Sequence, residues 1–140
     1  MEDHEIEDHE MASDAPPPWT TREEKILTQS WIIDCESVPA HALPHLHVTN
    51  NWTNIQNLYN GFIGFGNFRT YEDLQTKWEE MYRRMIWCQR YFLNHRHNSP
   101  GARDEHLVED VIDFYILNHN GRDFEHGEAW MLVLNKSYFK

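Results

Sequence analysis

Basic side chains recur along one stretch of the chain and are the residues best suited to bind an anionic partner. They are Arg69, Lys77, Arg83, Arg84 and Arg90. Guanidinium and ammonium groups bind phosphates and carboxylates through charge-assisted hydrogen bonds, so these positions are the candidate DNA-binding residues. An acidic side chain precedes three of these cations by four positions, as in Asp73 and Lys77, Glu79 and Arg83, and Glu80 and Arg84. This spacing predicts local ion pairs on a helix, which leave Arg90 and Arg69 with unpaired charge.

The net charge weakens the case for a phosphate-binding surface. The formal charge is -11, and seven of the 23 acidic residues lie in the first 14 positions, where no Lys or Arg occurs. The remaining chain still carries 16 acidic residues against 12 basic ones. Affinity for nucleic acid rests largely on Lys and Arg that release counterions, so a mildly acidic body is a poor electrostatic match for DNA.

No set of nucleophiles or metal ligands in the sequence predicts catalysis. His41, His45 and His47 lie close together, but no Cys-x-x-Cys or strong fourth ligand accompanies them, so exposed loop histidines are the better interpretation. Cys88 has apolar helical neighbours, which disfavour a thiolate, and no Ser/His/Asp order is present. We therefore expect a protein that is not an enzyme and has no metal site and no cofactor.

The cations must be positioned by a long central helix. Its apolar residues recur at alternating steps of four and three, which draws one continuous stripe on an α-helix. The stripe consists of Leu74, Trp78, Met81, Met85, Cys88 and Phe92. Past Met85 the predicted helix is apolar almost all round, and such a segment must be covered on more than one side. Trp87 and Tyr91 lie in this part and are the candidate protein-binding residues.

Four further helices are predicted around the central one, which makes the protein all-α. Thr20 and Glu23 form a capping box that opens the first helix, and Asn50 or Asn51 caps the second. The fourth helix carries Leu107, Val108, Val111, Ile112 and Tyr115, and the short fifth helix carries Trp130, Val133 and Leu134. We expect the fourth and fifth helices to pack on the second half of the third.

The chain divides into three parts on composition. Residues 1–18 are highly charged and end in a proline run, which predicts a disordered acidic tail. Residues 19–98 hold the first three helices, and residues 99–140 form a helical extension that packs on helix three. No apolar run approaches the roughly 18 residues that span a bilayer, and the N-terminus lacks the layout of a signal peptide. We expect a soluble intracellular protein.

Several short motifs in this order resemble one known family. They are Trp31, Trp52 and Trp78 on three successive helices; Arg69-Thr70, Leu74 and Lys77-Trp78; Cys88 near Tyr91-Phe92; Gly101-Ala102-Arg103-Asp104-Glu105; and Phe124-x-His126-x-x-Ala129-Trp130. From Trp19 to about Leu134 the chain resembles plant Myb/SANT-like, trihelix-like proteins labelled "no apical meristem-associated". That family is similar to the Myb-like accessory proteins of Harbinger-type DNA transposons.

The resemblance implies a Myb/SANT-like three-helix unit with an elongated third helix, covered by the two C-terminal helices. It also implies a non-enzymatic nuclear protein that recognises DNA and binds a transposase-like partner. The acidic balance makes a protein-binding adaptor the preferred hypothesis, with a larger family member or a transposase-like protein as its partner. Sequence-specific DNA binding through helix three is the alternative. Self-association, a cytoplasmic location and masking of the basic face by the acidic tail also stay open.

Overall fold

The computed structural model describes residues 18–37, 50–64 and 67–140, and within these ranges the protein is all-α. Five helices and no strand are present in the described segments, which confirms the predicted fold class. The helices are α2 (Thr21–Glu36), α4 (Trp52–Ile63), α5 (Tyr71–His97), α6 (Asp104–Asn118) and α7 (Gly127–Val133). The predicted tail up to residue 17 and the three loop histidines lie outside the described residues.

Side-chain caps set where α2 and α4 begin, as the sequence predicts. The Thr20 hydroxyl accepts a hydrogen bond from the Glu23 amide at 3.1 Å, and the Thr20 amide donates to the Glu23 carboxylate at 2.9 Å. This is the reciprocal pattern of a capping box. Asn51 caps α4, because its side-chain oxygen accepts from the Asn54 amide at 3.0 Å. Asp34, near the end of α2, accepts from the Asn51 amide at 3.1 Å and so joins the two helices.

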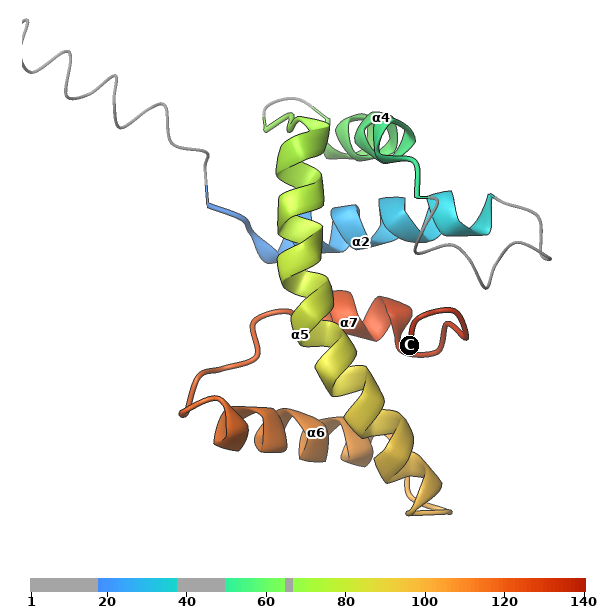
Figure 1. Cartoon of the computed structure of the whole chain (residues 1–140), viewed down its shortest axis with the longest axis vertical. Helices are drawn as coiled ribbons and strands as arrows, with labels where there is room; N and C mark the ends of the chain where they lie inside the picture. Colours follow the sequence, from blue (N-terminus) through green and yellow to red (C-terminus); the bar gives the residue numbers. More distant parts are fainter. Residues whose placement is uncertain (1–17, 38–49, 65–66) are drawn as a thin grey trace, which may run out of the picture.

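The long helix α5 runs through the whole molecule, as Figure 1 shows, and the other helices pack along it. All six residues of its predicted apolar stripe are buried. The first half of α5 packs against α2 and α4. The rings of Trp31 on α2 and Trp78 on α5 stack there, with centroids 4.7 Å apart. The prediction of a central helix with a core stripe is confirmed.

The two C-terminal helices occupy different places on this framework. As predicted, α6 packs on the second half of α5. Helix α7 packs closely on α2, an arrangement that the sequence does not predict. It also contacts α5, because the Trp130 indole nitrogen donates to the Gln89 side-chain oxygen at 2.8 Å. The Gln89 side-chain nitrogen in turn donates to the Leu134 carbonyl at 3.0 Å. Helix α7 is therefore held between α2 and α5.

Buried apolar residues from all five helices form one continuous core. The core includes Phe139, near the C-terminus, whose ring contacts Trp31 edge-on with centroids 6.0 Å apart. None of the helices in the described ranges is both long enough and apolar enough to cross a membrane.

Candidate functional site

Arg69, the first candidate cation, lies in the core. Its guanidinium is 3.2 Å from the Glu23 carboxylate, and both side chains are only 3% exposed. The same guanidinium lies 4.0 Å from the centre of the Trp19 ring, an arrangement that adds a cation–π contact. The Tyr59 hydroxyl donates to Glu23 at 3.4 Å. Arg69 therefore joins the start of α2 to the segment before α5 and presents no charge to solvent.

Lys77 and Arg84 also form ion pairs with carboxylates of this chain. The Lys77 ammonium lies 3.2 Å from the Glu24 carboxylate on α2, and its side chain is 13% exposed. Arg84 pairs with Glu80 at 3.1 Å, as predicted from their spacing. The predicted pair of Asp73 with Lys77 is absent, because Lys77 reaches Glu24 and, at 3.8 Å, Glu80 instead. Most of the charge on this half of α5 is compensated locally.

A buried histidine connects these charges, and the sequence pattern alone does not predict it. His126 lies next to the start of α7, with Nδ1 2.8 Å from a Glu24 oxygen and Nε2 3.1 Å from an Arg84 nitrogen. Arginine can only donate, so Nε2 accepts and Nδ1 donates its proton to Glu24. His126 thus forms a hydrogen-bond bridge between α2 and α5. In the sequence it stands out only as one residue of the Phe124-x-His126 motif.

These contacts lower the pKa of the two buried carboxyl groups below the usual 4.5. Burial opposes ionisation of Glu24, but the hydrogen bond from His126 and the charge of Lys77 outweigh it and lower the pKa. Burial also opposes ionisation of Glu23, where the Thr20 amide and the Arg69 charge outweigh it. Both groups therefore favour the folded state in their ionised form.

Acid is accordingly expected to destabilise the fold. The unfolded chain has the usual glutamate pKa of 4.5 and the folded chain a lower one, so the stabilisation is complete above the unfolded value. It is lost as the pH falls through the folded value. Urea unfolding at pH 7 and at pH 3 measures this loss. The difference should shrink in Glu24→Gln and stay unchanged in Glu109→Gln, a change at an exposed position; equal differences in both variants would contradict the assignment.

The remaining candidates share one side of α5 from the middle of the helix onward. The four are spaced four, three and one positions apart in the sequence, which places them next to one another on one face of the helix: Arg83, Trp87, Arg90 and Tyr91. Phe114 of α6 continues this surface, since its ring stacks on Tyr91 with centroids 4.4 Å apart and an interplanar angle of 16°. Trp87 stacks on Tyr91 at 5.9 Å. We call these five residues the aromatic–arginine face.

The two arginines of this face are exposed and keep their charge available. Neither Arg83 nor Arg90 forms an ion pair or side-chain hydrogen bond with any residue in the described segments. The predicted pair of Glu79 with Arg83 is therefore wrong. Trp87 and Tyr91 are half-buried, and Phe114 is 37% exposed. The structure thus brings together two of the five candidate cations and both candidate protein-binding aromatics.

Burial makes the thiols of the two cysteines poorly reactive. Cys35 and Cys88 are free and buried, and burial raises the pKa of each to about 12. Both therefore stay protonated at neutral pH. No group of three or more His, Cys, Asp or Glu residues in these segments is arranged to hold a metal ion.

Comparison of the chain with protein-family models, with curated proteins and with solved structures gives no match.

Proposed function

We propose that this chain is a non-enzymatic adaptor that binds an acidic segment of a partner protein through the aromatic–arginine face. In this proposal α2, α4 and α5 correspond to a Myb/SANT-like three-helix unit. The resemblance of the sequence motifs supports a nuclear location and a larger family member or a transposase-like protein as the partner.

One observation carries the proposal. Arg83 and Arg90 are exposed without an ion pair in the described structure, and they lie beside the stacked rings of Trp87 and Tyr91. Aromatic residues and arginine are the types most enriched at the energetic centres of protein interfaces. The stacked rings offer a rigid apolar surface for aliphatic or aromatic side chains, and the guanidinium groups bind carboxylates next to them.

The face carries two cations, Arg83 and Arg90, and so small a number favours a protein partner over a phosphate backbone. A site with two phosphate contacts loses only about tenfold in affinity between 50 and 200 mM salt, whereas proteins with 6 to 10 contacts lose roughly 10³ to 10⁵. Two arginines therefore supply little of the electrostatic affinity that DNA-binding proteins use.

Sequence-specific DNA binding remains the second candidate on a separate observation. In the described part of the chain α5 is the third helix, after α2 and α4, and Arg83 and Arg90 lie on one exposed side of it. In a Myb-like unit this is the helix that enters the major groove. Such a reader would need these two arginines to supply the contacts that Arg69 and Lys77 do not offer.

The test uses the full chain and two matched variants. The double substitution Arg83→Glu and Arg90→Glu reverses the charge of the face, whereas Arg103→Glu reverses an exposed arginine on another part of the surface. We expect the main protein captured by the full chain to bind at least about tenfold more weakly to the double variant, because each lost charge pair costs on the order of 1 kcal/mol or more. Its affinity for the Arg103→Glu variant should not change.

A DNA selection separates the two functions. The full chain is incubated with a random-sequence DNA library at about 100 mM salt. Enrichment of a defined motif that disappears in the double variant would favour the DNA reader and contradict the adaptor proposal. Equal partner binding by the double variant and the unchanged chain would also contradict it.

A further inference from the structure

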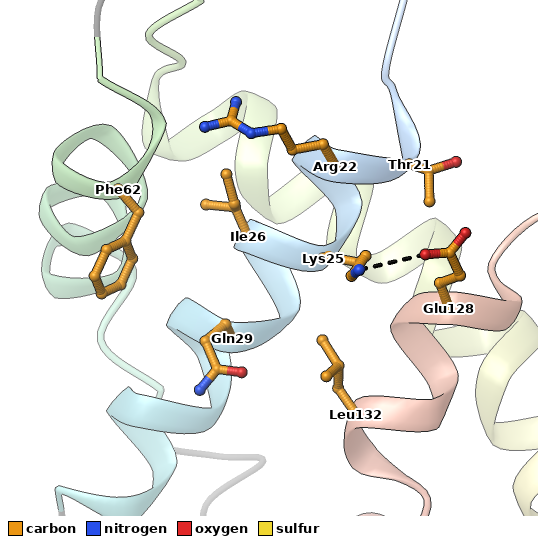
Figure 2. Close-up of a pocket in the computed structure, with 8 residues that line it drawn as sticks. All are labelled: Thr21, Arg22, Lys25, Ile26, Gln29, Phe62, Glu128 and Leu132. Carbon is orange, nitrogen blue, oxygen red and sulfur yellow. Dashed lines mark hydrogen bonds and ion pairs between the residues drawn. The ribbon is translucent and has the colours of Figure 1, made fainter.

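A groove on α2 provides a second surface with the features of a binding site. It has a volume of about 700 Å³. Figure 2 shows α2 as its floor, with Phe62 of α4 on one side and Leu132 and Glu128 of α7 on the other. The lining residues are Thr21, Arg22, Lys25, Ile26, Gln29, Phe62, Glu128 and Leu132. None of them belongs to the aromatic–arginine face, which lies on α5 and α6.

Apolar side chains from three helices meet in this groove. Phe62 is 49% exposed, an unusually large open area for a phenylalanine on a packed helix, and Ile26 and Leu132 are half-buried. Their exposed surface lies on both sides of the groove floor (Figure 2). A partner that inserts apolar side chains between Phe62 and Leu132 removes this surface from water, which is the dominant favourable term in association.

The charge at one end of the groove is positive. Arg22 is exposed and makes no ion pair or side-chain hydrogen bond within the described segments. Lys25 pairs with Glu128 at 3.3 Å, but both side chains are largely open to solvent, at 45% and 65% exposure. Exposed pairs of this kind hold their partners weakly. This end of the groove therefore carries two cations and one carboxylate, and its net positive charge complements a negatively charged group of a partner.

We propose that the groove binds an acidic amphipathic helix of a partner protein. Apolar residues on one face of that helix, three or four positions apart, occupy the space between Phe62 and Leu132. A carboxylate at one end of the helix pairs with Arg22. The volume lies in the range of 300 to 1,000 Å³ typical of sites for compact ligands, so it accommodates a few side chains of a helix rather than a whole domain.

The N-terminal segment of this chain is the competing occupant. Residues 1–17 are rich in acidic side chains and lie shortly before Thr21 in the sequence, a residue that lines the groove. The large apolar residues of this segment are Met1, Ile6 and Met11, which lie five positions apart. The two apolar walls require large apolar side chains three or four positions apart on one helix face, so an external partner fits the groove better. This site lies apart from the aromatic–arginine face, and its existence does not depend on the proposed function.

The experiment selects binders for the full chain from a library of 12-residue peptides. We expect enrichment of sequences with two apolar residues three or four positions apart and an Asp or Glu toward one end. Synthetic peptides of this kind should bind at least tenfold more weakly to Arg22→Glu and to Phe62→Ala. Phe68→Ala is the matched control, because Phe68 is 62% exposed and does not line the groove. In a second selection, Arg22→Glu should enrich Lys or Arg in place of the acidic residue.

Four outcomes overturn the proposal. The first is no enrichment, and the second is binding that Phe62→Ala leaves unchanged. The third is peptide binding that appears only after the acidic residues of positions 1–14 are replaced by amides, since the N-terminal segment is then the natural occupant. The Arg83→Glu and Arg90→Glu double variant should keep full peptide affinity. A loss there would place the peptides on the aromatic–arginine face and would also overturn the groove assignment without contradicting the proposed adaptor function.

Discussion

Replacing Arg69 with methionine is expected to lower the free energy of unfolding by about 3 to 5 kcal/mol, the usual cost of breaking a buried ion pair. The Glu23 carboxylate, only 3% exposed, would keep its hydrogen bond from the Thr20 amide but lose its charged partner. The Trp19 ring would lose the guanidinium above it. Urea unfolding at pH 7, followed by tryptophan fluorescence, measures the change.

Two further variants separate this cause from a general effect of losing an arginine. Arg83→Met removes an exposed arginine from the same helix that Arg69 precedes, and it should change stability by no more than about 0.5 kcal/mol. Adding Glu23→Gln to Arg69→Met removes the unpaired buried charge and should restore part of the loss. A loss below about 1 kcal/mol in Arg69→Met would contradict a structural role for the ion pair.

The helices could be predicted from the sequence because their signals are local. The apolar stripe of α5, the Thr20 and Glu23 capping box and the Asn51 cap all depend on residues within a few positions of one another. The period of the apolar residues also identifies which side of α5 faces the core. Burial of the whole stripe follows directly from that period.

The partners of the charged residues could not be predicted in the same way. The helix spacing rule assigns Lys77 to Asp73 and leaves Arg69 unpaired, but local pairs on a helix stabilise by only about 0.2 to 0.5 kcal/mol. Tertiary packing overrides so small a preference once a buried carboxylate is near. Arg69 pairs with Glu23, 46 positions away, and His126 with Glu24, 102 positions away. Only the packing of α2 on α5 and α7 brings these groups together.

The groove could not be predicted from the sequence for a related reason, because it depends on where α7 lies. The sequence predicts α7 as a short helix on helix three, and its packing on α2 places Leu132 and Glu128 opposite Phe62. No local sequence pattern predicts that α7 packs on α2. The aromatic–arginine face, in contrast, was partly predictable, since four of its five residues belong to one helix.

Replacing Gln89 with leucine is expected to destabilise the protein by about 2 to 4 kcal/mol and to loosen α7 most. Gln89 is 1% exposed and makes two hydrogen bonds, one from the Trp130 indole and one to the Leu134 carbonyl. Leucine offers neither, and each buried polar group left without a partner costs about 1 to 3 kcal/mol. Urea unfolding gives the total loss, and hydrogen exchange of the amides in α6 and α7 shows where the structure opens.

The location of the change matters as much as its size, because α7 forms one wall of the groove and no part of the aromatic–arginine face. Faster exchange in α7 than in α6 should therefore accompany weaker binding of groove peptides and unchanged binding of the adaptor's main partner. Met131→Ala is the matched control on α7, since Met131 is half exposed and lies outside the groove lining. Equal loss of both binding activities in Gln89→Leu would mean that the two surfaces are coupled through α5, where Gln89 and Trp87 are two residues apart.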